Sequence, residues 1–145
     1  MKAERGYKFL EHTADAYVAA YGKDLAKAFE NAAVAMFDVM TEVEKINPLT
    51  EDHVEANGDD EQELLYSWLE ALLVKFEVNG MLCSQFKVSS LEETDDGFKL
   101  TANIRGEKFD AARHTQKVAV KAATYHRMEI VKTIGKVTLE FILDI

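Results

Sequence analysis

Carboxylates near the two ends of the chain are the side chains whose types could carry out chemistry. Residues 11–15 read Glu-His-Thr-Ala-Asp and end on Asp15, while Asp144 and Ile145 close the sequence. The terminal carboxylate of Ile145 would add a further negative group. If the fold brings these three residues together, their oxygens form the donor set that Ca²⁺, Mg²⁺ and Mn²⁺ prefer. A metal site is therefore one hypothesis, and the spacing alone selects no particular metal.

Each of these acids also has a simpler structural interpretation. Thr13 and Asp15 could organise a turn through bonds from side chain to backbone, which is common for both residue types. Asp144 could be the solvated end of an edge strand. Glu140 lies four residues earlier on the same strand face. It is either a third acid of the site or, as we expect, an ordinary cross-strand salt-bridge partner.

A second polar group follows Gly106 and consists of Glu107, Asp110 and His114. It contains a histidine, but no two of the four histidines stand at the helical spacing of zinc ligands. The single cysteine, Cys83, excludes an internal disulfide and a cysteine-based zinc site, and we expect it to be a buried structural thiol.

The common signatures of catalysis are missing from the sequence. It contains no Gly-x-x-x-x-Gly-Lys-Ser/Thr loop, no Gly-x-Gly-x-x-Gly loop and no Gly-x-Ser-x-Gly elbow. No complete machinery for an independent enzyme is therefore visible.

Two helices are predicted to supply much of the core. The first begins after Asp24, a good N-cap, and carries apolar residues at helical spacing as far as Met40. The second follows the acids at 59–61, and the Asn-Gly pair at 79–80 ends it. Its apolar stripe includes Trp68, which we expect to pack in the core.

Alternating apolar and polar residues predict strands over most of the remaining chain. The Asp-Asp-Gly sequence at 95–97 predicts a hairpin turn between strands at 86–91 and 98–104. In the last strand, Glu140 and Asp144 lie on the face opposite the apolar one. Further strands are expected at 7–11, 17–21, 118–123, 128–133 and 136–145.

These elements predict a single α+β domain over residues 1–145. Two amphipathic helices are expected to cover one face of a mainly antiparallel or mixed sheet. Residues 48–63 hold the only proline and seven acids without a base. They are expected to form an acidic connection or a small excursion.

The charge of the chain is distributed unevenly. The net charge is −9, and residues 1–64 hold 15 acids and 6 bases, whereas residues 65–145 hold 11 of each. The usual interpretation is two solvated faces, and the sharper one is docking on a charged partner. An acidic chain is not expected to bind nucleic acid strongly by itself. Neither a signal peptide nor a run of about 20 apolar residues occurs, which predicts a cytoplasmic protein without a membrane partner.

Several short motifs, taken in order, resemble the archease family over nearly the whole chain. The combination of the Glu-His-Thr-Ala-Asp start with the Leu-Asp-Ile finish is the most specific part. The motifs are Phe-Leu-Glu-His-Thr-Ala-Asp at 9–15, Trp-Leu-Glu at 68–70, Gly-Glu at 106–107 with Asp110 and His114, Val-Lys-Ala-Ala-Thr-Tyr-His at 120–126, and Leu-Asp-Ile at 143–145.

This resemblance implies an accessory protein rather than an enzyme. Archeases assist the RNA-splicing ligase that joins tRNA exon halves, and they act in related RNA repair. They promote guanylylation of the ligase's active-site histidine and allow multiple turnover. Members have also been described as chaperone-like modulators of a tRNA cytosine methyltransferase. The implied fold is an α+β sheet domain.

The resemblance further implies roles for individual residues. A divalent metal ion would be bound by Asp15 and Asp144, with Ile145 as an additional oxygen ligand. The metal would be calcium, magnesium or manganese. Candidates for contact with the partner or for activation come from the same motifs and from the last strand: Lys121, Glu140, His12, Glu107 and His114.

Two other classes of protein remain as alternatives, and each predicts a different property. A general chaperone module would expose an apolar patch, and the sequence offers no obvious one. A small metal-dependent hydrolase would turn over substrate without any partner.

Overall fold

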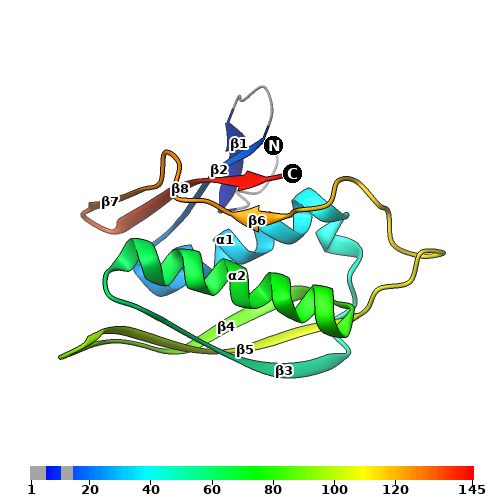
Figure 1. Ribbon diagram of the computed structural model, residues 1–145, viewed down its shortest axis with the longest axis horizontal. Helices are drawn as coiled ribbons and strands as arrows, with labels where there is room; N and C mark the ends of the chain where they lie inside the picture. Colours follow the sequence, from blue (N-terminus) through cyan, green and yellow to red (C-terminus); the bar gives the residue numbers. More distant parts are fainter. Residues whose placement is uncertain (1–5, 11–14) are drawn as a thin grey trace.

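Two antiparallel sheets enclose a pair of helices in the computed structural model, which describes residues 6–10 and 15–145 (Figure 1). Sheet A has the order β1-β2-β8-β6, and β7 also pairs with β8; sheet B has the order β3-β5-β4. Sheet A consists of β1 (Tyr7–Leu10), β2 (Ala16–Gly22), β6 (Ala122–Ala123), β7 (Glu129–Thr133) and β8 (Lys136–Asp144). Sheet B consists of β3 (Thr50–Gly58), β4 (Met81–Thr94) and β5 (Gly97–Lys108).

The α+β class with two helices and antiparallel pairing is confirmed. The expectation that the helices cover one face of one sheet is wrong. Helix α1 (Leu25–Met40) packs on β2 and β4, and helix α2 (Glu61–Asn79) packs on β3 and β6, so both helices contact both sheets (Figure 1). The apolar surface of each helix is therefore wide enough to be covered from two sides.

The ends of both helices follow their sequence signals. The Asp24 carboxylate accepts a hydrogen bond from the Lys27 N–H, and Asp60 caps α2 in the same way. Gly80 ends α2 in the left-handed conformation, with φ of 67°, which is open to glycine at little cost.

Residues 48–63 form regular structure rather than a loop excursion. Strand β3 occupies most of this segment and pairs along its whole length with β5. Val54 and Ala56 point into the core, while His53 and Glu55, which alternate with them, are exposed. Glu51 and Glu55 lie on the solvent face of this edge strand, whereas Asp52 is half-buried on the face of Val54 and pairs with Lys75. The high charge of the segment obscures the alternation of buried and exposed residues.

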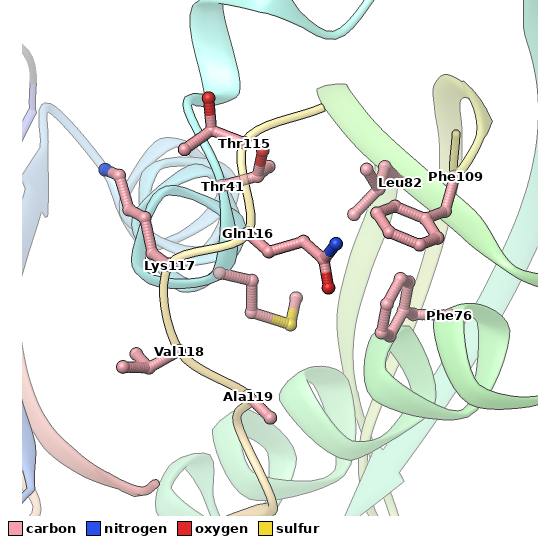
Figure 2. Close-up of a pocket in the computed structure, with 10 residues that line it drawn as sticks. Thr41, Phe76, Leu82, Phe109, Thr115, Gln116, Lys117, Val118 and Ala119 are labelled. Carbon is pink, nitrogen blue, oxygen red and sulfur yellow. The ribbon is translucent and has the colours of Figure 1, made fainter. Parts of the chain in front are cut away.

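The strand expected at 118–123 forms only at β6, whose two residues pair with the end of β8. Residues 115–119 before it are all exposed and have no regular structure. We call residues 115–119 the strap. Its apolar residues Val118 and Ala119 suggested the start of a strand, but neither pairs in a ladder among the described residues (Figure 2).

A continuous core fills the space between the sheets. Trp68 is fully buried, as expected, and its Nε1–H donates to the Phe29 carbonyl oxygen at 2.9 Å. Its indole meets the ring of Phe86 edge-on, with centroids 6.3 Å apart. Cys83 is buried as well, and burial raises the pKa of its thiol to about 12. No helix within residues 6–10 and 15–145 has the length and apolar character needed to cross a membrane.

Candidate functional site

One end of the β2–β8 ladder brings the two acidic segments of the sequence together. The ladder's last pair joins Ala16 to Leu143. Asp15 directly precedes Ala16, and Asp144 directly follows Leu143. The next position on each strand is therefore an aspartate, on the face of sheet A that points away from the helices. We call this end of sheet A the acidic edge.

Lys121 lies on the other side of Asp144. Its N–H donates to the Asp144 carbonyl oxygen at 2.7 Å, and Ala122 then pairs with Asp144 in register. Asp144 and Lys121 are exposed, while Asp15 is half-buried. Ile145 is half-buried and packs against the core. The strands thus place two carboxylates and one ammonium-bearing residue at the acidic edge.

Glu140 stands apart from this group along the strand. Four residues of strand separate Glu140 from Asp144, a distance of about 13 Å. The Tyr17 hydroxyl donates to its Oε1 at 3.3 Å from the neighbouring strand. Glu140 thus has a cross-strand partner, and the contact is a hydrogen bond rather than a salt bridge.

The metal role of the acidic edge stays a prediction. Within the part of the chain that the structure describes, no group of three or more His, Cys, Asp or Glu residues gathers to hold an ion. A metal at Asp15 and Asp144 would need further oxygens from main-chain carbonyls, from Ile145, from water or from a partner. His12 and the rest of 11–14 lie outside the described residues.

Glu107 and His114 meet each other on the opposite side of the helix layer, in and beside sheet B. The His114 Nδ1 accepts a hydrogen bond from the Asp110 N–H at 2.9 Å, so the ring hydrogen sits on Nε2. Nε2–H donates to Glu107 Oε2 at 2.9 Å. Glu107 also accepts from the Asn47 N–H at 2.8 Å and pairs with Arg113. We call these five residues the Glu107 cluster.

Three donors, Asn47, His114 and Arg113, keep the Glu107 carboxylate ionised. Burial by itself would raise the pKa of this carboxyl, which is 8 % exposed. The hydrogen bonds from Asn47, His114 and Arg113, together with the Arg113 charge, outweigh burial and lower the pKa to about 2. The cluster is therefore a stable structural clamp joining β5 to the loops before β3 and before the strap.

The clamp and two further contacts fix the course of the chain towards Lys121. The Lys117 N–H donates to the Met40 carbonyl oxygen at 3.0 Å, and its ammonium donates to the Asp38 carbonyl oxygen at 2.9 Å. After Lys121, the Ala123 N–H donates to a Glu70 carboxylate oxygen at 2.8 Å. The strap is thus fixed before, within and after its length, and Lys121 is held at the acidic edge.

Glu70 and Tyr17 are the residues that reasoning from the sequence did not assign to the site. Glu70 positions β6 from helix α2, and Tyr17 positions Glu140. Only its place in the Trp-Leu-Glu motif at 68–70 could have pointed to Glu70, because a single acid on a helix does not otherwise indicate a functional role. Nothing in the sequence indicated the contact of Tyr17 with Glu140, because the register of β2 against β8 determines it.

Comparison with known proteins gives a consistent set of relatives. The profile of the Archease protein family matches residues 7–145. A protein named archease from Sulfurisphaera tokodaii is 43% identical over 139 residues, covering 96% of this chain and 98% of its own. One of the same name from Methanothermobacter thermautotrophicus is 42% identical over 141 residues, covering 97% and 99%.

Two solved structures share the fold. The solution structure of Methanobacterium thermoautotrophicum protein 1598 matches with a TM-score of 0.83 and 40% identity, covering 98% of this chain and 100% of its own. The crystal structure of an archease, described as a possible chaperone, from Thermotoga maritima matches with a TM-score of 0.60 over 95% of this chain and 96% of its own. At 14% identity, this second likeness supports the fold alone.

Proposed function

Because the chain belongs to the archease family, we propose that it is an accessory protein that activates an RNA-splicing ligase in tRNA splicing and RNA repair. In this role it promotes guanylylation of the ligase and multiple turnover, and it uses a divalent metal ion to do so. It is not itself the catalyst.

The observation that carries the proposal is the meeting of Asp15 with Asp144 at the end of the β2–β8 ladder. These residues are about 130 positions apart in sequence, so only the fold makes them neighbours. Asp144 is exposed and Asp15 half-buried, and placing these two like charges side by side is unfavourable because they repel. A bound cation would remove that repulsion.

The residues present suit a hard cation. Asp15 and Asp144 would hold it through carboxylate oxygens, with Ile145 supplying a further oxygen, and calcium, magnesium and manganese all accept such donors. When bound, the ion supplies positive charge that can offset developing negative charge on a triphosphate.

Lys121 adds a second positive group next to the ion. Its main chain is fixed to Asp144, whereas its side chain is exposed and can reach outward. We therefore assign Lys121 to contact with the phosphates or acidic groups at the ligase site. The Glu107 cluster holds the strap that leads to Lys121, which gives His114 and Glu107 an indirect positioning role.

The test is single-turnover guanylylation of the RNA-splicing ligase from the same organism. Asp15→Asn and Asp144→Asn each remove one carboxylate at nearly constant shape. We expect each to lower the stimulated rate by at least tenfold and to abolish calorimetric binding of Mn²⁺ or Ca²⁺. Asp96→Asn, in the exposed β4–β5 turn, makes the same chemical change elsewhere and should preserve both.

The two readouts separate the parts of the proposal. Full stimulation by both folded variants would exclude the acidic edge from activation. Loss of stimulation with metal binding intact would leave the edge as a docking surface without a resident ion. Turnover of RNA or phosphate esters by the protein alone would instead indicate an enzyme.

A chaperone-like modulator of a tRNA cytosine methyltransferase is the second candidate. It is favoured by the description of the Thermotoga maritima structure as a possible chaperone. The exposed large apolar side chains among the described residues come from scattered elements, including Leu49, Val78 and Ile134. This distribution argues against general binding of unfolded chains. Suppression of aggregation for several unrelated clients would favour the chaperone.

A further inference from the structure

Two lysines meet at the end of the β2–β8 ladder opposite the acidic edge, where β2 leads into α1 and β7 turns into β8 (Figure 1). The last pair of the ladder at this end joins Gly22 to Val137. Lys23 follows Gly22, and Lys136 precedes Val137, so the next position on each strand is a lysine. The acidic edge carries an aspartate at both corresponding positions. Eight residues of strand separate the two ends, a distance of about 26 Å.

The lysines line a cleft of about 740 Å³, which lies within the range of about 300–1,000 Å³ usual for ligand sites. Lys27, from the first turn of α1, lines it as well, and none of the residues described around it is acidic. The chain as a whole holds 26 acids and 17 bases, so a hollow lined by three bases and no acid runs against its composition. We call this hollow, with Lys23, Lys27 and Lys136, the basic cleft.

Hydrogen bonds between elements fix the base of the cleft. The Tyr21 N–H donates to the Gly6 carbonyl oxygen at 2.7 Å, and the Asn31 Nδ2 donates from α1 to the Tyr21 carbonyl oxygen at 2.8 Å. Gly135, in the β7–β8 turn, has a φ of 73°, and a Cβ placed on it would meet nothing within 4 Å. The cleft is therefore fixed at its base and open beside Gly135.

The three ammonium groups differ in how far they are already neutralised. The Lys27 Nζ lies 3.4 Å from a carboxylate oxygen of Glu30. The Lys136 Nζ lies 4.7 Å from the centroid of the Tyr21 ring, which is a neutral partner. Lys23 and Lys136 are both exposed. Two like charges side by side on neighbouring strands are unfavourable, and a bound anion would relieve their repulsion.

The nearest acid in the sequence has another role. The Asp24 carboxylate caps α1 by accepting from the Lys27 N–H, and Asp24 is not among the residues that line the cleft. The helix N-terminus is thus occupied by its own cap. The attraction for an anion comes instead from the lysine side chains.

From these observations we propose that the basic cleft binds a phosphate monoester, the terminal phosphate of an RNA strand or of a nucleotide. Such a group carries a charge of about −1.5 to −2 at pH 7 and three acceptor oxygens, which matches two lysines. A protein carboxylate or an internal phosphodiester carries a single negative charge and matches them less well. Holding one terminal group is compatible with weak binding of nucleic acid by an acidic chain. The proposal depends neither on the acidic edge nor on ligase activation.

Nuclear magnetic resonance titration of the isotope-labelled full chain tests the basic cleft. A chelator is present throughout, so that no divalent ion at the acidic edge can hold the probe. Methyl phosphate should produce saturable shifts at residues 21–23, at Lys27 and at residues 135–136. Dimethyl phosphate and acetate, each with one charge, should bind at least threefold more weakly. Binding of methyl phosphate should also weaken at least threefold from pH 7.5 to pH 5, because its second pKa is about 6.

Matched variants locate the site on the surface. Lys23→Gln and Lys136→Gln should each weaken binding of methyl phosphate roughly three- to tenfold, because each removes one charge and keeps the length of the side chain. Lys87→Gln, on an exposed position of β4, makes the same change outside the cleft and should leave binding unchanged. Equal effects of all three variants would overturn the proposal, and so would equal binding of methyl phosphate and acetate.

A second set of probes identifies the source of the phosphate. A 5′-phosphorylated RNA tetranucleotide that binds more tightly than adenosine monophosphate would assign the cleft to an RNA end. Equal binding of the two would assign it to a free nucleotide. The same RNA with a 5′-hydroxyl should bind at least threefold more weakly than the phosphorylated form. A tetraglutamate peptide that binds more tightly than the phosphorylated RNA would overturn the proposal in favour of an acidic protein segment.

Discussion

Glu107 illustrates how much one buried carboxylate can contribute to the stability of the fold. Its contacts with Asn47, Arg113 and His114 give it a structural role at the base of the strap. A direct contact of Glu107 or His114 with a partner stays a prediction. The strength of the clamp can be read from its dependence on pH, because the charge of the carboxylate is what the donors stabilise.

Glu107→Gln should flatten the acid limb of the stability profile. The folded pKa of about 2 lies below the ordinary value of 4.5, so Glu107 stabilises the fold by about 3 kcal/mol above pH 4.5 and loses this as the pH falls towards 2. Urea denaturation at a series of pH values measures the difference between wild type and variant.

That difference should be largest above pH 5 and should shrink steadily on acidification. Glu93→Gln, on the exposed part of β4, is the control and should follow the wild-type profile. A constant difference between Glu107→Gln and wild type from pH 6 to pH 2 would contradict the role of the ionised carboxylate.

The pairing of β4 with β5 depends on a close approach at one glycine. Gly106 pairs with Cys83 and Thr50, next to a register shift in β4. A Cβ placed on Gly106 would collide with the Leu82 carbonyl oxygen, which belongs to the main chain and cannot rotate away. Gly106 also precedes Glu107, so the strands must close here for the Glu107 cluster to form.

Gly106→Ala should lower the free energy of unfolding by roughly 3 kcal/mol, because the strands must separate locally. Gly80→Ala is the comparison. Its φ is 67°, but a Cβ there meets nothing closer than Lys108 Cγ at 3.9 Å. It should cost only about 1 kcal/mol from backbone conformation. Thermal or urea denaturation distinguishes the two, and equal costs would show that the close approach is relaxed in solution.

The elements differ in how far the sequence predicts them. Capping residues and apolar stripes locate both helices, because these signals are local. The strap and β3 were misassigned, because their pairing depends on whether a distant strand edge is free. At the acidic edge, strand faces predicted that Asp144 points away from the core. Its position beside Asp15 follows only from the register of β2 against β8, which no local pattern encodes.

In the whole molecule, ion pairs link the acidic earlier half of the sequence to the later half, although the net charge stays −9. Basic residues of the later half pair with acids of the earlier half, as Lys117 does with Asp38 and Lys132 with Glu61. Arg113 pairs with Glu107 in addition. These pairs do not include Lys121, which is exposed at the acidic edge.

Trp68 joins the layers of the molecule, so its replacement tests whether they unfold as one unit. Trp68→Phe removes the hydrogen bond to Phe29 and part of the indole volume, and should cost about 2 kcal/mol. Circular dichroism must follow the transition, because Trp68 is the only tryptophan. Tyr66→Phe on the same helix is half-buried and should cost less.

Hydrogen exchange identifies where the stability is lost. If the two sheets share one core through the helices, protection should fall in both sheet A and sheet B by the same amount. A loss confined to one sheet would contradict a single cooperative unit.

The β2–β8 pairing also sets the order in which the protein can be completed during synthesis. Strands β3, β4 and β5 precede the last quarter of the chain, so sheet B can close before that quarter has left the ribosome. Sheet A cannot, because Tyr17 waits for a contact 123 residues downstream. Such distant contacts slow folding. The two aspartates therefore meet only in the last step, and a nascent or truncated chain would lack the acidic edge.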